Sequence, residues 1–241
     1  MKIAILLAAA AGMSFAGQPV AASQPASAST APDGRAWSAV VTKTDAGGYL
    51  MGNPDAPVKV VEYASLTCGH CAHFAAEGEA PLKADYVDSG RVSFELRNYT
   101  LNVVDTAASL LARCGDENQF FPMVDAMFAR QGSWWSSKIP ALRELVPQLQ
   151  PLEPAEQLAR IAEATGLKAI AAEQGLSKSA ADACLADEAA LDELAAIRAS
   201  AMADHQVRGT PTFVIDGVTA TDFNQWDGLK PALDRALGAA D

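Results

Sequence analysis

The feature that most constrains this chain is a pair of cysteines placed between a predicted strand and a predicted helix. The run from Val58 to Ala64 is mostly apolar and rich in strand-forming residues, which is typical of a strand buried on both faces of a sheet. Cys68-Gly69-His70-Cys71 follows and opens a helix that we expect to continue to about Val87. Residues 91–99 alternate with period two, which predicts another strand. These segments form a β-α-β unit with parallel strands and a right-handed crossover.

Two cysteines three residues apart at a helix start can close a small disulfide ring. The helix N-terminus offers unpaired N–H groups and a partial positive charge, which stabilise a thiolate on Cys68. Such sites lower a thiol pKa to roughly 3.5–7.5, and His70 can donate a hydrogen bond or place a positive charge beside the sulfur. A more stable thiolate favours the reduced form and makes the disulfide more oxidising. We predict that a substrate thiolate attacks the disulfide at Cys68, and that a second substrate thiol releases the reduced protein.

The cysteine motif has two other interpretations. The Cys68–Cys71 bond could be a purely structural disulfide. Cys68, His70, Cys71 and His73 could also bind a metal, but zinc needs four convergent ligands and the second half of a finger-like pattern is missing. Covalent haem needs a histidine directly after the second cysteine, and Ala72 stands there. We therefore expect no metal, and no cofactor other than the redox-active disulfide itself.

Glu62 interrupts the apolar strand six residues before Cys68. A carboxylate in that position is costly unless it is satisfied. Near a buried cysteine it can accept or return a proton, through water, as Cys71 cycles between thiol and disulfide, and its pKa is expected to be raised. The alternative is a charge that points to solvent from an edge strand.

The N-terminal segment predicts export. Met1-Lys2 carries one positive charge, residues 3–11 are apolar, and small-x-small cleavage sites occur between residues 16 and 28. This is the composition of a secretory signal, which we assign to residues 1–22, with a flexible lead-in over residues 23–37. An uncleaved anchor helix is disfavoured because the run is shorter than the roughly 20 residues that a membrane span needs. Exported thiols meet oxidising conditions.

The rest of the chain completes a mixed pattern of strands and helices. A short strand is predicted at residues 39–42, and residues 101–205 keep helical spacing. Residues 212–220 are predicted to form a hairpin with Asp216-Gly217 as its turn, and residues 226–237 a closing helix. The order is β-βαβ, a helical block, then ββα. The formal net charge of -11 argues against nucleic acid as a partner.

A strand bearing Glu62, the Cys68–Cys71 motif on a helix and a late Gly209-Thr210-Pro211 before a hairpin together resemble the thioredoxin superfamily. The helical block is similar to that of the DsbA-type branch, the bacterial periplasmic dithiol oxidases. The resemblance covers roughly residues 38–240. It implies an α/β, thioredoxin-like fold with an inserted α-helical domain at 101–205, the thioredoxin-like domain being formed by 38–100 and 206–241.

The resemblance also implies a role for each matching residue. Cys68 matches the nucleophile, Cys71 the buried resolving cysteine, His70 the thiolate stabiliser and Glu62 the buried proton acceptor. Thr210-Pro211 matches a cis-proline loop that guides the substrate backbone; by themselves X-Pro bonds are mostly trans. Gly69-His70 and Thr210 are similar to protein disulfide isomerases, whereas the best-known DsbA oxidases have Pro-His and often valine.

The remaining cysteines, Cys114 and Cys184, both lie in the helical block. In an oxidising compartment the simple hypothesis is a structural disulfide between them, and similar relatives carry a second pair in this region. The alternative is two buried free thiols.

The leading prediction is a periplasmic dithiol oxidase that donates its disulfide to newly exported or unfolded proteins with cysteines. A membrane redox partner similar to DsbB would reoxidise it. We expect a monomer, because only a short lead-in precedes the first strand and isomerases of the DsbC and DsbG type carry an N-terminal dimerisation domain. Two alternatives stay open: a disulfide isomerase or reductase, and a redox-inert binding or chaperone module.

Overall fold

The structure is a computed structural model, and it describes residues 30–238. The predicted signal peptide, residues 1–22, lies outside the described residues, as do residues 23–29 of the predicted lead-in at 23–37. Between residues 30 and 238, no helix has both the length and the apolar character that crossing a membrane requires.

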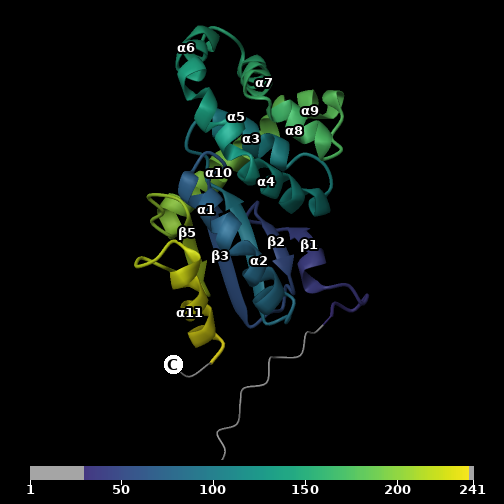
Figure 1. Ribbon diagram of the computed structural model, residues 1–241, viewed down its shortest axis with the longest axis vertical. Helices are drawn as coiled ribbons and strands as arrows, with labels where there is room; N and C mark the ends of the chain where they lie inside the picture. Colours follow the sequence, from purple (N-terminus) through teal and green to yellow (C-terminus); the bar gives the residue numbers. More distant parts are fainter. Residues whose placement is uncertain (1–29, 239–241) are drawn as a thin grey trace, which may run out of the picture.

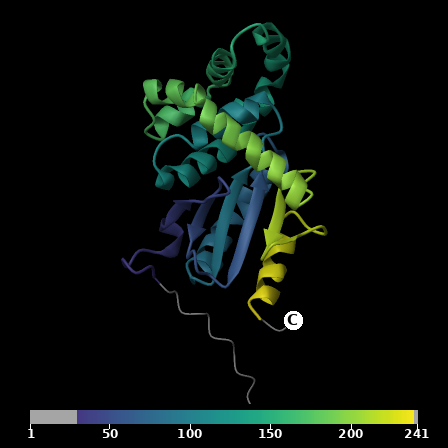
Figure 2. The ribbon, with the colours of Figure 1, turned by 180° about the vertical axis from the view of Figure 1, so that it is seen from behind.

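Six strands form one mixed sheet in the order β1-β2-β4-β3-β5-β6 (Figures 1 and 2). Their bounds are β1 Val41–Lys43, β2 Tyr49–Gly52, β3 Val58–Ala64, β4 Val92–Asn98, β5 Thr212–Ile215 and β6 Val218–Thr219. The pair β3 and β4 is parallel, and the other neighbours are antiparallel. The apolar run that predicted a buried strand is therefore β3, with a neighbour on each side.

The predicted helix after the cysteine motif is divided into three segments: α1 Gly69–Glu77, α2 Glu79–Pro81 and η2, a π-helical stretch at Leu82–Val87. The first break is at Gly78, where a Cβ atom would lie 2.6 Å from the Phe74 ring. The second follows Pro81, which has no N–H to donate to the helical hydrogen-bond pattern. These segments and α11 Trp226–Ala236 cover one face of the sheet (Figure 1).

Helices α3 to α10 lie between β4 and β5 in the chain, and we call them the helical insert. Figure 1 shows the insert above the sheet, at the end where α1 begins, and Figure 2 shows α10 crossing the opposite face. The bounds are α3 Val103–Ala112, α4 Phe120–Ala129, α5 Gln131–Trp134, α6 Ile139–Leu149, α7 Pro154–Thr165, α8 Leu167–Glu173, α9 Lys178–Leu185 and α10 Glu188–Asp204. Three 3-10 turns are η1 Trp37–Ala39, η3 Glu117–Gln119 and η4 Ser136–Lys138.

Strand β2 was not predicted, because glycines next to a short apolar run are typical of turns. The structure explains them by close packing. A Cβ atom on Gly48 would lie 2.1 Å from the Glu95 carboxylate, and Gly52 has a φ of +113°, which L side chains rarely adopt. The predicted hairpin is confirmed, since Asp216 and Gly217 turn between β5 and β6 with φ angles of 49° and 83°.

Candidate active site

The cysteine motif lies at the junction of β3 and α1. Cys68 is the N-cap residue of α1, and Cys71 is in the first turn. Both are free thiols; Cys71 is buried and Cys68 is half-buried. The site is therefore in its reduced, dithiol state, with one sulfur accessible and the other covered.

The surroundings of Cys68 stabilise a thiolate. They lower its pKa to about 5, and the largest cause is a hydrogen bond from the Cys71 thiol. The side chain of Thr210 and the backbone N–H groups of Cys71 and His70 lower the pKa further, while burial opposes them. At neutral pH Cys68 is consequently ionised and nucleophilic.

Cys71 behaves in the opposite way. Burial, its donation to Cys68 and the nearby charge of Glu62 raise its pKa well above the ordinary thiol value. Its Sγ also accepts a hydrogen bond from the backbone N–H of Ser65 at 3.5 Å. The two sulfurs therefore have separate tasks: Cys68 can attack or leave as a thiolate, and Cys71 holds a proton in the reduced state.

Glu62 lies on β3, and 2% of its surface is exposed. The alternative of a solvent-facing charge on an edge strand is wrong, because β3 pairs with both β4 and β5. Burial raises the pKa of Glu62 well above its ordinary value, and the like charges of Glu79 and Cys68 raise it further. Its Oε1 has no hydrogen-bond partner among the described residues, so the group is poised to hold a proton near Cys71.

At pH 8 the Glu62→Gln variant is expected to be more stable than the wild type by about 2 kcal/mol. The raised pKa means that the folded protein binds this proton more tightly than the unfolded chain. The wild type therefore loses folding stability as the pH rises from the ordinary carboxyl pKa to the raised pKa of Glu62 in the folded protein. The glutamine variant does not titrate and keeps its stability over this range. Denaturant titrations at pH 8 and pH 4 measure the difference, which should vanish at pH 4.

The matched control is Glu77→Gln, which removes an exposed carboxylate from the outer face of α1. It is expected to change the free energy of unfolding by less than about 0.5 kcal/mol at either pH. If Glu62→Gln and the wild type were equally stable at pH 8, the buried and protonated state of Glu62 would be contradicted.

The imidazole of His70 is exposed, and it is the backbone of this residue that contacts the site. Its N–H contributes to the low pKa of Cys68, and its carbonyl accepts a hydrogen bond from Gln225 at 3.1 Å. Stabilisation of the thiolate by the His70 ring stays a prediction.

The loop before β5 faces the cysteines. The Thr210–Pro211 peptide bond is cis, and the Cys68 thiol donates to the Thr210 carbonyl at 3.2 Å. When Cys68 is ionised it has no proton to donate to this carbonyl. The Thr210 hydroxyl has no hydrogen-bond partner among the described residues while Cys68 is a thiol. Once Cys68 is a thiolate, this hydroxyl can donate to its sulfur. A groove of about 350 Å³ adjoins the loop, with Gly209, Thr212 and Phe223 among its lining residues.

Two residues of the helical insert that the sequence did not single out contact the loop leading to Cys68. Gln131 Nε2 donates to the carbonyls of Leu66 and Cys68 at 2.8 and 2.9 Å. Asp105, which is fully buried, accepts from the backbone N–H of Leu66 at 2.9 Å. Only the capping pattern at the start of α3 could have drawn attention to Asp105, and no local signal identifies Gln131.

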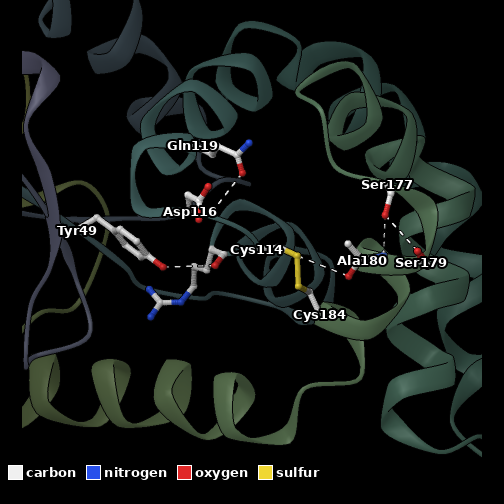
Figure 3. The surroundings of a disulfide bond; sticks show 9 residues. Tyr49, Cys114, Asp116, Gln119, Ser177, Ser179, Ala180 and Cys184 are labelled. Carbon is white, nitrogen blue, oxygen red and sulfur yellow. Dashed lines mark hydrogen bonds between the residues drawn. A yellow bond between two sulfur atoms is a disulfide. The ribbon is translucent and has the colours of Figure 1, made fainter.

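Cys114 and Cys184 form a disulfide away from the motif (Figure 3). It joins the residues just after α3 to α9, with a Cα–Cα distance of 5.9 Å and a sequence separation of 70. As for the metal alternative, residues 30–238 contain no group of three or more His, Cys, Asp or Glu side chains arranged to hold an ion.

Comparisons with known proteins agree with this geometry. A family model described as thioredoxin matches residues 44–235. The crystal structure of a protein-disulfide isomerase from Novosphingobium aromaticivorans is 31% identical, with a TM-score of 0.73, over 78% of this chain and 96% of that one. Wolbachia pipientis alpha-DsbA1 is 24% identical, with a TM-score of 0.65, over 79% and 91% of the two chains. These likenesses confirm the predicted fold class.

A curated relative from Rickettsia bellii bears the name of a protein-disulfide oxidoreductase and is 28% identical over 82% of this chain. The chain spans 68% of the length of that protein and 63% of a similarly named protein from Rickettsia conorii.

Proposed function

We propose that the chain, which belongs to the thioredoxin family, acts as an exported, DsbA-like dithiol oxidase. The observation that carries this proposal is the contrast between the two sulfurs. Because the pKa of Cys68 is lowered to about 5, the reduced form is stabilised, and the disulfide becomes a stronger oxidant.

The proposed reaction starts from the Cys68–Cys71 disulfide. A substrate thiolate attacks Cys68 Sγ, the S–S bond breaks, and Cys71 leaves and takes a proton from Glu62. A second substrate thiolate then attacks the substrate sulfur of the mixed disulfide and releases Cys68 as a stable thiolate. Two electrons pass from the substrate dithiol to the protein, and the substrate gains a disulfide. Thr210 and Pro211 are proposed to align the substrate backbone beside Cys68.

We further propose that newly exported proteins with cysteines are the substrates and that the periplasm is the location. The predicted signal at residues 1–22 supports export. A quinone-linked membrane protein similar to DsbB would reoxidise the dithiol, and the protein would act as a monomer with the disulfide as its only redox group.

A second candidate function is disulfide isomerase or reductase. It is favoured by Gly69-His70 and Thr210, which are similar to the isomerase pattern, and by the likeness to the protein-disulfide isomerase from Novosphingobium aromaticivorans. An oxidase reacts with its substrate as the Cys68–Cys71 disulfide, whereas an isomerase or reductase reacts as the dithiol.

The redox state of the motif in living cells tests the choice. Acid quenching followed by alkylation should find Cys68 and Cys71 mostly as a disulfide if the protein is an oxidase. A mostly dithiol population would contradict the oxidase and support the isomerase or reductase. The Cys114–Cys184 pair, alkylated in the same sample, is the internal reference for a structural bond.

A further inference from the structure

We propose that Asp105 is a positioning residue for disulfide exchange: its buried carboxylate holds the loop that ends in Cys68 and opposes negative charge on that sulfur. The inference rests on the proposed thiol–disulfide chemistry. Through Asp105, the first turn of α3 in the helical insert influences how strongly oxidising the Cys68–Cys71 disulfide is.

Both oxygens of Asp105 are engaged by fixed donors. Oδ1 accepts from the backbone N–H of Leu66 at 2.9 Å. Oδ2 accepts from the backbone N–H of Leu101 at 2.9 Å and from the Ser65 hydroxyl at 2.5 Å. Each oxygen faces a backbone N–H, and the ionised carboxylate, which only accepts, suits this set of donors. An amide would turn its NH₂ group toward one of these donors and leave that donor unpaired.

The contacts continue from Asp105 to the cysteines. Ser65, which donates to the carboxylate, also donates its backbone N–H to Cys71 Sγ. The Ser65 hydroxyl lies 3.1 Å from that of Thr67, which accepts from Asn102, the N-cap of α3, at 3.0 Å. The loop between β3 and Cys68 is therefore connected to the insert by a continuous series of buried and part-buried hydrogen bonds.

The same carboxylate adds an unfavourable charge to the site. The titratable groups near Cys68 are Cys71 and His70 on α1, Glu62 on β3 and Asp105 on α3. The Cys68 thiolate adds to the burial that raises the pKa of Asp105 to about 6, and by reciprocity the Asp105 charge raises the pKa of Cys68. Asp105 therefore fixes the loop and at the same time limits the stability of the thiolate.

The test is the Asp105→Asn variant in the full-length protein. Removal of the charge is expected to lower the pKa of Cys68, read from thiolate absorbance, by about half a unit. The [GSH]²/[GSSG] ratio that half-reduces the protein should then fall about threefold at pH 7. A purely structural role predicts the opposite direction, since a loosened loop would lose the N–H bonds that stabilise the thiolate.

Asn102→Ser is the matched control, because it keeps a capping residue and the Asp105 charge while removing the bond to Thr67. It should leave the pKa of Cys68 unchanged or higher. Asp105→Glu, which keeps the charge, should not lower it. A pKa of Cys68 that is unchanged or raised in Asp105→Asn overturns the proposal.

If Asp105→Asn does not fold, the wild type still gives an answer. Carboxyl ¹³C titration should show a higher Asp105 pKa in the reduced than in the oxidised protein, and equal values overturn the inference. These results are independent of the redox state in cells. An isomerase would still show the coupling between Asp105 and Cys68, and an oxidase could lack it.

Discussion

The Cys68→Ala variant is expected to lose disulfide exchange by at least about 1000-fold, because the reacting nucleophile is removed. Cys68 is the sulfur whose pKa is lowered to about 5, and Cys71 cannot replace it, since it is buried and its pKa is raised. Insulin reduction at pH 7 measures the loss. If the wild type and Cys68→Ala both reduced insulin no faster than the uncatalysed reaction, the enzyme would be rejected and the redox-inert binding module would be left.

The companion variant, Cys71→Ala, separates attack from resolution. It keeps the Cys68 nucleophile, so mixed disulfides should form and persist, and they should be visible on non-reducing gels. Because the Cys71 thiol is the largest cause of the low pKa of Cys68, the pH at which Cys68 alkylates at half its maximal rate should rise above the wild-type value. Rapid release of the mixed disulfides would show that Cys71 is not the resolving cysteine.

The Cys114→Ala/Cys184→Ala double variant is expected to lose about 4 kcal/mol of folding stability. The bond closes a loop with a sequence separation of 70, and the chain-entropy estimate for a loop of this length gives roughly that value. For a chain of this size the melting temperature should fall by roughly 8–16 °C. Calorimetry of the two purified proteins measures it.

Activity at 25 °C is the control for that experiment. The bond joins the end of α3 to α9 and is not among the contacts of Cys68 or Cys71, so insulin reduction should change by less than about twofold. Non-reducing peptide mapping must first find the bond in the wild type. An unchanged melting temperature in the double variant would contradict a structural role for the bond.

The parts of the fold that could be predicted are those whose signals lie in neighbouring residues of the sequence. Strands β3 and β4 and the hairpin turn at Asp216-Gly217 carry their signals in neighbouring residues, as apolar runs, period-two alternation and a turn dipeptide. Strand β2 has no such signal. Gly48, just before this strand, is required by close packing against Glu95, which is far away in the sequence, and Gly52 at its end has a positive φ.

The same distinction applies to the site. The cysteine pair and Glu62 were identified from their spacing along one β-α unit. Asp105 and Gln131 were not, because their relation to Cys68 arises from how the insert packs on the sheet. At His70 the structure shows a contribution of the backbone N–H, which any residue except proline would supply, to the low pKa of Cys68, and the role of the ring stays a prediction.

The position of the cis-proline loop so late in the chain has a consequence for how the protein is made. Thr210 follows Cys68 by 142 residues, which a ribosome takes roughly 7–28 s to add. During that interval Cys68 and Cys71 have been synthesised but the cis-proline loop that contacts Cys68 has not. Cys114 likewise precedes its partner Cys184 by 70 positions. Four cysteines allow three pairings. Closure of a ring needs the oxidising compartment that the proposed export supplies. A ring that closes there first between the two near neighbours leaves one pair, so entry of the chain with its N-terminus first favours the native connectivity.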